Sequence, residues 1–458
     1  MIWKTSLSCQ LEWLAACDLR VAVSARVFLY REELVIETIE KNVQAVADEV
    51  EETFQKLAEK TRDSIGITRA SYSRQETEAH LFLAQQAQAS GLEVSTDYAV
   101  NTYMTLPGTD RSLPRVIMGS HLDSVQSGGN YDGAAGVVAG LYALKVLKNM
   151  GLKPAMDLCA MGIRGEESVW FQVSYLGSRA ALGGLPADAL DAVRIDTQCT
   201  LREHLIEAGG SPEAIENQTA ILKPENVKAF LEVHIEQAPK LVEENLPLGI
   251  CLAVPAMVMY PDVRITGAYG HVGTPMEYRR DAALAGAQIA YLMDRFWLTQ
   301  HQSGSALAMT LGRFHTNTQA HGLTTIPGEF FFSIDMRGYD ERLLEQFEQN
   351  FLDTVQQVEK EKGVQVDLGE RRTAPLGVMD PKIIEALTTS AEELKIPFTQ
   401  LYSPACHDAG AFSAAGIPTG MLFIRNEHGS HNPAESMEIE DFLQSLKVLI
   451  LWLLKEVG

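Results

Sequence analysis

The sequence has no uninterrupted apolar stretch long enough to cross a membrane. Its most apolar amino-terminal part, residues 11–30, is interrupted by four charged side chains, whereas a spanning helix needs about 20 predominantly apolar residues. No small-residue cleavage site follows a basic start, so we do not expect a secretory leader. We interpret residues 1–33 as a helical or poorly ordered extension outside the functional fold.

Basic residues are few relative to acidic ones. The chain has 38 Lys and Arg against 60 Asp and Glu, which gives a formal net charge of −22. Nucleic acids and anionic membrane surfaces are bound by basic patches, so we expect neither as a partner. A small carboxylated substrate is not excluded, because a few local arginines are enough to hold one.

Cysteine is also scarce, with six residues spread along the chain and no CxxC pair. This usage is typical of reduced thiols in a cytoplasmic protein. The hydrophobic content of 46% and charged content of 21% indicate a globular chain. A chain of 458 residues is longer than a single domain with one hydrophobic core usually is, so we predict two domains.

The first large part of the chain, residues 34–256, alternates helices and strands. Apolar residues three and four apart predict a helix over 36–57. Ser73 and Glu76 predict a capped start for a second helix, which Gly91 ends. Short apolar runs predict strands at 92–94, 101–106, 116–118, 156–163 and 230–237. Their helix-length connections predict an α/β fold with a mostly parallel sheet.

A change of element order marks residues 257–371. Here the predicted order is strand, helix, strand, strand, helix, strand, at 262–266, 280–297, 306–313, 329–337, 341–362 and 364–368. This order resembles an inserted ferredoxin-like α+β domain. In residues 372–458 a helix at 381–395, a strand at 420–424 and a closing helix at 439–454 predict a return to the first domain.

A polar motif follows the predicted strand at 116–118. His121 and Asp123 stand at the strand end, and Asp132 stands just before a predicted helix. Open α/β sheets place their ligand crevice at the carboxyl ends of strands. Imidazole and carboxylate together suit zinc, manganese or cobalt. Taken alone, the motif is explained equally well by a helix-capping aspartate and an unrelated loop histidine.

Later polar residues supply what the first motif lacks. Glu166 and Glu167 end a predicted strand, His234 lies in an alternating strand, and His431 lies in a turn after the last strand. Taken alone, the glutamate pair is more often a solvated turn and His234 a core or surface residue than a ligand, whereas the loop position of His431 weakly favours function. Together with His121 and Asp132 they predict a two-metal site, in which one Glu binds metal while its neighbour takes a proton from water.

The ordered motifs resemble the dinuclear metal aminoacylase/carboxypeptidase family. The similarity is greatest to its branch of N-carbamoyl-L-amino-acid hydrolases, β-ureidopropionases and allantoate amidohydrolases, and covers roughly residues 35 to 458. The motifs are His121-x-Asp123, Asn130-Tyr-Asp-Gly133, Glu166-Glu167, His234-Ile-Glu-Gln237, Gly270-His-Val-Gly-Thr-Pro-Met276, Arg279-Arg-Asp281, Ile326-Pro-Gly-Glu329, His407-Asp-Ala409 and Ser430-His-Asn-Pro-Ala-Glu435.

The resemblance implies a metal centre with two divalent ions, either zinc, manganese or cobalt. His121 and His234 would bind one ion, Glu167 and His431 would complete the second site, and Asp132 would bridge the two. The inserted domain would act as a lid and as the dimerisation domain of a homodimer.

The resemblance also implies roles around the metals. Glu166 would be the general base and then the acid, and Asp123 would orient His121 from behind. His271 would stabilise the oxyanion in the partner subunit's site. The residues expected to contact substrate are Gln237, Thr324, Arg337, Cys406 and His407. Among them Arg337 would clamp a carboxylate, for which a planar two-pronged donor is suited.

Departures from the branch pattern all lie on the substrate side. Thr324-Thr325 precedes Ile-Pro-Gly where the branch has Asn, and Cys406 stands where it tends to have glycine. Ala238 replaces glycine, and the 270–276 motif is one residue shorter. Residues 168–171 also differ from the usual Gly-Ser-Arg-Phe. Because no metal ligand is replaced, we predict retained hydrolysis with a changed substrate preference.

The prediction is a metal-dependent hydrolase acting on a linear C–N bond of a small carboxylated molecule. An N-carbamoyl-L-amino acid is the first substrate expected. Allantoate or an N-carbamoyl-β-amino acid is the alternative within the branch, and an aminoacylase or dipeptidase keeps the fold but changes the bond. A non-catalytic metal-binding protein is disfavoured by Glu166, since a structural site needs no base beside its ligand.

Overall fold

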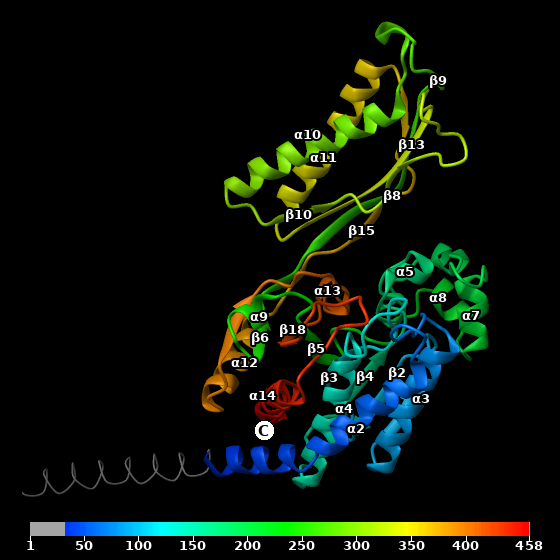
Figure 1. Cartoon of the computed structure of the whole chain (residues 1–458). Coiled ribbons are helices and arrows are strands. Elements are labelled where there is room, and N and C mark those ends of the chain that lie inside the picture. Colours follow the sequence, from blue (N-terminus) through cyan, green and yellow to red (C-terminus); the bar gives the residue numbers. More distant parts are fainter. Residues whose placement is uncertain (1–32, 458) are drawn as a thin grey trace, which may run out of the picture.

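The computed structural model describes residues 33–457. Nearly all of the predicted extension, residues 1–33, lies outside the described residues. Two β-sheets organise the described chain into a larger and a smaller body (Figure 1). The larger sheet is mostly parallel and the smaller one is antiparallel, so the predicted α/β class with an α+β insert is confirmed.

The larger body is built on an eight-stranded sheet. Its order is β1-β2-β4-β3-β5-β18-β6-β17. The strands are β1 (Glu93–Thr96), β2 (Thr102–Leu106), β3 (Arg115–His121), β4 (Leu158–Ile163), β5 (Val227–Ile235), β6 (Leu248–Cys251), β17 (Phe398–Leu401) and β18 (Thr419–Ile424). The four central strands β4, β3, β5 and β18 run parallel. Their carboxyl ends therefore meet at one edge.

Helices cover both faces of this sheet. One face carries α2 (Ala47–Thr61), α3 (Arg74–Ala89), α4 (Ala134–Asn149), α12 (Pro381–Glu393) and α14 (Ile439–Val457). The other carries α6 (Leu176–Ala181) and α13 (Asp408–Ala414). Successive strand residues point to opposite faces. In β3, Met118 accordingly packs in the first core and Ile117 in the second.

Short helices fill the segment between β4 and β5. They are α5 (Ser168–Phe171), the 3-10 helix η1 (Ala187–Asp191), α7 (Leu201–Glu207) and α8 (Pro212–Glu216), and a further short helix, α9 (Lys240–Glu243), follows β5. The elements between β4 and β5 pack a small apolar cluster of their own around Trp170 and Phe171. Trp170 donates its indole N–H to the Ser124 carbonyl at 2.7 Å, so this cluster also supports the loop after β3.

The smaller body is a six-stranded antiparallel sheet covered by two long helices. The strands are β8 (Ala256–Thr266), β10 (Leu307–Thr310), β11 (Phe314–Thr316), β13 (Glu329–Gly338), β14 (Gln365–Asp367) and β15 (Arg372–Ala374); the helices are α10 (Ala282–Gln302) and α11 (Glu341–Lys362). The main order β10-β13-β8-β14 is that of a ferredoxin-like unit. Figure 1 shows both helices on one side of the sheet.

Two strand pairs stand apart from the large sheets. The chain passes between the bodies twice, and β7 (Ala253–Val254) pairs there with β16 (Gly377–Val378). At the far end of the smaller body, β9 (Gly270–His271) pairs with β12 (Thr325–Ile326), next to the 3-10 helix η2 (Met276–Tyr278). Across the described residues, no helix is both long and apolar enough to span a membrane.

Two predicted helix starts differ in detail. The helix expected over 36–57 is interrupted, because the Val46 N–H bonds to the Val43 carbonyl three residues back, and α2 begins afresh after Val46. At α3, the Ser73 hydroxyl accepts from the Glu76 N–H at 3.2 Å. The Glu76 carboxylate does not complete the capping box, because it is turned inward to bind Arg164 at 2.9 Å.

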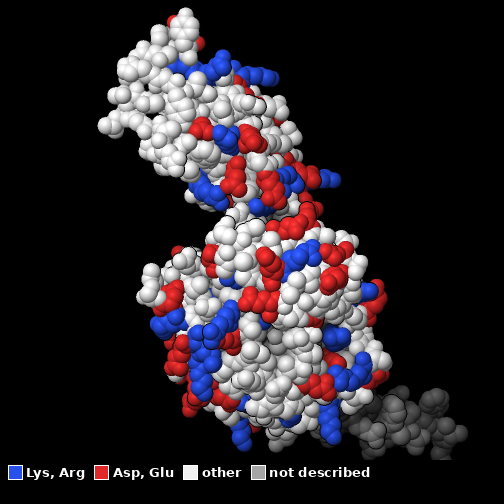
Figure 2. Space-filling model, turned by 90° about the vertical axis from the view of Figure 1, so that its right-hand side faces the viewer, with Lys and Arg blue, Asp and Glu red and all other residues white. Residues whose placement is uncertain are grey.

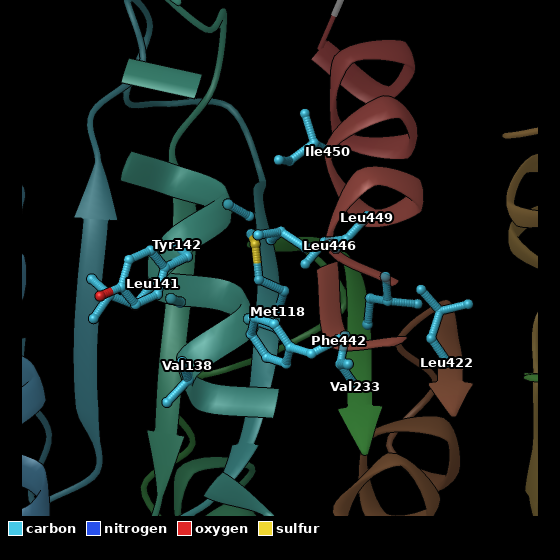
Figure 3. Packing of buried hydrophobic residues seen from close by; sticks show 14 of the residues in the cluster. Met118, Val138, Leu141, Tyr142, Val233, Leu422, Phe442, Leu446, Leu449 and Ile450 are labelled. Atoms are coloured by element: carbon cyan, nitrogen blue, oxygen red, sulfur yellow. The ribbon is translucent and has the colours of Figure 1, made fainter. Parts of the chain in front are cut away.

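The core beneath the site gives a direct test of packing. Met118 is fully buried between α4 and α14 (Figure 3). Met118→Ala should lower the free energy of unfolding by about 2–5 kcal/mol, because it removes apolar contacts and leaves a cavity. Urea unfolding of the metal-free protein measures this. Val378→Ala, at a side chain that is 56% exposed, is the control and should change stability by about 0.5 kcal/mol or less. Equal effects would contradict this packing.

Candidate functional site

The candidate site lies at the carboxyl ends of the four parallel central strands. His121 is the last residue of β3, and His234 lies near the end of β5. Glu167 follows β4, and His431 lies in the loop after β18. Asp132 stands two residues before α4, and its carboxylate reaches back toward the strand ends. The structure thus brings together all five predicted metal ligands.

Two groups of donor atoms share one carboxylate. In the first, Asp132 Oδ1 lies 3.3 Å from His121 Nε2 and 3.2 Å from His234 Nε2. In the second, His431 Nε2 lies 3.5 Å from Asp132 Oδ2 and 3.4 Å from Glu167 Oε1. Within each group the ligand atoms lie within 4.8 Å of one another. Imidazole nitrogens and carboxylate oxygens are donors that zinc, manganese and cobalt accept, so both groups fit such an ion.

Burial and opposite charges together perturb the titration of this cluster. Burial alone would raise the pKa of Asp132, but the imidazoles of His121 and His234 hold it well below its usual value. Burial would lower the pKa of His121, yet the carboxylates of Asp123, Asp132 and Glu166 hold it well above the ordinary range. The site therefore concentrates negative charge that a cation would neutralise.

Asp123 supports both sides of the site from behind. Its Oδ1 lies 3.4 Å from His121 Nδ1, which also contacts the Asp123 carbonyl at 3.0 Å. Its two carboxylate oxygens accept the Glu166 and Glu167 N–H groups at 3.0 Å each. Ser71 donates to Oδ2 at 2.6 Å. One buried carboxylate thus orients a ligand imidazole and the turn that carries both glutamates.

Glu166 faces the first donor group. Its Oε2 lies 4.0 Å from His121 Nε2, and its side chain is 11% exposed. Burial raises the pKa of Glu166 well above its usual value, and the adjacent Glu167 carboxylate adds to this against the opposing effect of His121. A carboxylate with raised basicity at the edge of a donor cluster is suited to accept and return a proton.

A pocket joins the donor cluster to several predicted substrate residues. Gln237, Arg337, Cys406 and His407 line it together with the donor residues. Its remaining walls are Ser168, Ser174, Tyr175, Met257, Met259 and Ala405. Arg337 belongs to β13 of the smaller body, so the pocket is closed from both bodies.

The predicted substrate-binding residues differ in how many of their polar atoms already have hydrogen-bond partners within the protein. Arg337 lines the pocket and binds Asp335 through Nε at 3.0 Å and Nη2 at 2.9 Å, so its Nη1 is not used in this ion pair. Gln237 donates to Asp132 Oδ2 at 2.7 Å, and its buried Oε1 is without a hydrogen-bond partner among the described residues. His407 Nε2 is likewise buried and unpaired there. Cys406 lies against the Pro255 carbonyl at 3.5 Å.

His271 and Thr324 lie elsewhere. His271 is an exposed residue of β9, and the Thr324 carbonyl accepts the Val272 N–H at 2.9 Å beside the β9–β12 pair. This pair lies at the end of the smaller body that is remote from the eight-stranded sheet (Figure 1). Within one chain, neither residue joins the pocket that holds the donor cluster.

Sequence reasoning assigned no role to several buried residues that support the site. Glu232 precedes His234 by two positions on β5 and accepts from Ser120 at 2.7 Å and from the Ala409 N–H at 2.7 Å. Glu435 accepts from the Asp132 N–H at 3.2 Å. Glu232 lies two residues before His234, and Glu435 lies four residues after His431. An acidic residue this close to a predicted ligand, within or beside a recognised motif, is the sequence signal that could have identified them.

Curated relatives span most of the chain. It is 32% identical over 387 residues to an N-carbamoyl-L-amino acid amidohydrolase of Geobacillus stearothermophilus, which covers 84% of this chain and 92% of that protein. It is 31% identical over 403 residues to a ureidoglycolate hydrolase of Arabidopsis thaliana, covering 86% and 82%. It is 30% identical over 411 residues to an allantoate amidohydrolase of Escherichia coli K12, covering 88% and 96%.

Solved structures share the fold over a similar length. A crystal structure of AtUAH in complex with (S)-hydroxyglycine is 30% identical, with a TM-score of 0.77 and coverage of 89% of this chain and 97% of that one. A hydantoinase/carbamoylase family amidase from Burkholderia ambifaria is 27% identical, with a TM-score of 0.73 and coverage of 90% and 98%.

A family model completes the comparison. It describes peptidase family M20/M25/M40 and matches residues 117–455, a segment that includes both donor groups and Glu166. The resemblance predicted from the motifs is thereby confirmed. On this match and on the relatives above, the chain belongs to peptidase family M20/M25/M40.

Proposed function

We propose that this chain is a metal-dependent amidohydrolase that cleaves a linear C–N bond of a small carboxylated substrate, with N-carbamoyl-L-amino acids as the first candidates. One observation carries the proposal: two donor groups share Asp132, and Glu166 stands beside them in the wall of a pocket that Arg337 also lines. Curated relatives with N-carbamoyl-L-amino acid and allantoate amidohydrolase names support it.

Two divalent ions are proposed as the cofactors, one for each donor group. His121, His234 and Asp132 would hold one ion, and Asp132, Glu167 and His431 the other. Zinc, manganese and cobalt all accept this donor set. When bound, such a pair polarises a carbonyl and lowers the pKa of water.

The residues of the chain then carry the proton transfers. Glu166 takes a proton from water while the water oxygen forms a bond to the carbonyl carbon of the substrate. Glu166 then gives this proton to the departing nitrogen as the C–N bond breaks. Asp123 keeps Glu166 in place through the backbone N–H. For a ureido substrate the products are the free amine and carbamate, which decays to carbon dioxide and ammonia.

Substrate binding is proposed from the pocket walls. Arg337 would bind the substrate carboxylate, and Gln237 and His407 offer polar atoms that have no partner among the described residues. Met257, Met259 and Cys406 provide an apolar, sulfur-rich wall for a substituent. Allantoate is the second candidate, because Ser168 and Ser174 also line the pocket and could bind its second ureido group.

A homodimer that forms through the smaller body is part of the proposal. His271 and Thr324 lie in its remote end, where several large apolar side chains are exposed, among them Met276 at 86% and Leu323 at 107%. On the face that Figure 2 shows, much of this body carries no charged side chain. Clustered exposed apolar side chains are typical of protein contact surfaces. A partner subunit would bring His271 to the neighbouring pocket as an oxyanion donor.

Domain limits and location complete the proposal. Residues 34–256 and 372–458 would form the catalytic domain, and residues 257–371 the lid and dimerisation domain; the six-stranded sheet, which runs from Ala256 to Ala374, supports limits near these positions. A cytoplasmic location is proposed because Cys159, Cys199, Cys251 and Cys406 are free thiols.

A substrate panel on metal-depleted protein tests the activity. Chelated protein should be inactive, and restoring manganese, zinc or cobalt should restore release of ammonia and amine together from an N-carbamoyl-L-amino acid. The panel adds N-carbamoyl-β-alanine, allantoate, ureidoglycolate, N-acetyl amino acids and dipeptides. Amine without ammonia from acyl or peptide substrates would overturn the ureido assignment. Full activity after chelation, verified by metal analysis, would overturn the metal mechanism.

A further inference from the structure

Glu435 is a buried carboxylate beside the donor cluster that belongs to neither donor group. It is 7% exposed and lies in the loop after β18, four residues beyond His431. Its Oε1 accepts the backbone N–H of Tyr131 at 2.9 Å and that of Asp132 at 3.2 Å. A carboxylate that accepts two peptide N–H groups fixes the backbone that carries the shared aspartate.

Ser430 closes this contact into a ring. Its hydroxyl donates to Asp132 Oδ2 and contacts Glu435 Oε2 at 2.8 Å. Asp132 is thereby held at both its backbone and its side chain by a loop about 300 residues further along the chain. Because that same loop carries His431, the ring fixes the distance between two donors that the sequence places far apart.

The turn before Asp132 is shaped to receive Glu435. A Cβ on Gly129 would lie 2.2 Å from Glu435 Oε1, so the carboxylate fits only against a glycine. On the other side, the buried Arg69 donates to the Asn130 side chain at 3.3 Å and to the Asn130 carbonyl at 3.4 Å. Arg69 Nε also binds the Leu122 carbonyl at 2.7 Å. The turn is therefore held between a guanidinium and a carboxylate.

We propose that Glu435 is a positioning residue of the metal centre, which sets the separation of Asp132 and His431 and so the affinity for divalent ions. This inference rests on the proposed metal-dependent function. Hydrogen bonds that orient metal ligands contribute typically 10- to 100-fold to metal affinity. Glu435 orients a ligand that both donor groups share, so its loss should weaken both groups.

The test measures metal binding without any substrate. Chelated wild-type protein, Glu435→Ala and Glu435→Gln are titrated with Mn²⁺ by calorimetry and with Co²⁺ by visible absorption. Glu435→Ala should bind Mn²⁺ about 10- to 100-fold more weakly and change the Co²⁺ spectrum. Glu435→Gln should recover most of the affinity, because the amide oxygen still accepts from the two N–H groups. Ser430→Ala should weaken binding in the same direction but less.

Glu348→Ala is the matched control. Glu348 is 9% exposed, binds Tyr260 and Arg371, and lies in the smaller body. It should lower thermal stability while leaving Mn²⁺ affinity unchanged. If Glu435→Ala folds and binds Mn²⁺ as tightly as wild type, Glu435 only supports the fold and the proposal is overturned. If it does not fold, Ser430→Ala with wild-type affinity and spectrum overturns the proposal in the same way.

The failure of the proposed function gives a different result. Wild-type protein that binds two Mn²⁺ but cleaves no ureido substrate would overturn the proposed substrate class and leave the role of Glu435 standing. Wild-type protein that binds no divalent ion would overturn both.

Discussion

Glu166→Gln should lower kcat by about 10²- to 10⁴-fold and leave the bound metal at the wild-type level, because the glutamine keeps the shape of the side chain but cannot accept a proton from water. Glu166 is outside both donor groups, and its Oε2 lies 4.0 Å from His121 Nε2, so the donor atoms stay in place. Steady-state kinetics on the preferred substrate of the panel, with metal content measured on the same preparation, gives both quantities.

Glu167→Gln is the matched control for this prediction. It changes the neighbouring carboxylate by the same single group, but Glu167 belongs to the second donor group, 3.4 Å from His431 Nε2. It should lose metal as well as turnover, and added metal should restore part of the activity. Glu166→Gln should not respond to added metal. A Glu166→Gln enzyme with wild-type kcat would remove Glu166 from the proton transfer.

The convergence of the predicted metal ligands could be expected from the sequence, because the carboxyl ends of parallel strands meet at the same edge of a sheet. His121, Glu167 and His234 each follow or end an apolar run that is long enough to identify a buried strand. Because β3 pairs in parallel with both β4 and β5, the residues at the carboxyl ends of these strands must lie close together. Their convergence follows from topology, and the ordered motifs made that topology easy to recognise.

Two short strands near one edge of the large sheet could not be expected in the same way. Leu248–Cys251 and Phe398–Leu401 are four residues each: the first lies between β18 and the second, and the second, at the edge, pairs with the first. They are about 150 residues apart in the chain, so neither segment shows a local pattern of its own. Pairing across such a distance is a tertiary effect that overrides local propensity.

The supporting contacts of the site were also beyond sequence reasoning. Asp123 was expected to orient His121, but its bonds to the two glutamate N–H groups depend on how β4 ends. Glu435 is part of a recognised motif, yet the partners of its Oε1 are peptide N–H groups, which leave no trace in the pattern of side chains. Unlike a helix cap, whose partners are three residues apart, a hydrogen bond from a side chain to a backbone group far away in the sequence is set by the folded geometry and appears only in the structure.

Arg337→Met should lower kcat/KM for a carboxylated substrate by about 30- to 4,000-fold, which corresponds to the roughly 2–5 kcal/mol lost when one partner of a buried charged pair is removed. Methionine keeps the apolar stem of the side chain. Asp335 binds Nε and Nη2 of Arg337 and holds the guanidinium in the pocket, so the free Nη1 is presented in a fixed direction. Arg337→Lys should recover little, because an ammonium lacks the planar arrangement of donors that binds Asp335 and a carboxylate together.

The carboxylate of the substrate provides the decisive comparison. Wild-type enzyme should prefer an N-carbamoyl amino acid over the corresponding carboxamide, which lacks the charge. Arg337→Met should lose most of this preference, because the positive charge that attracts the carboxylate is gone and Asp335 is left without its partner. Arg313→Met is the control, since Arg313 binds Asp262 on the exposed surface of the smaller body and should leave the preference intact. If Arg337→Met keeps the wild-type ratio of kcat/KM between the two substrates, another group binds the carboxylate. His407 is then the residue to substitute next, because it also lines the pocket and its Nε2, which has no hydrogen-bond partner among the described residues, can carry a proton to donate.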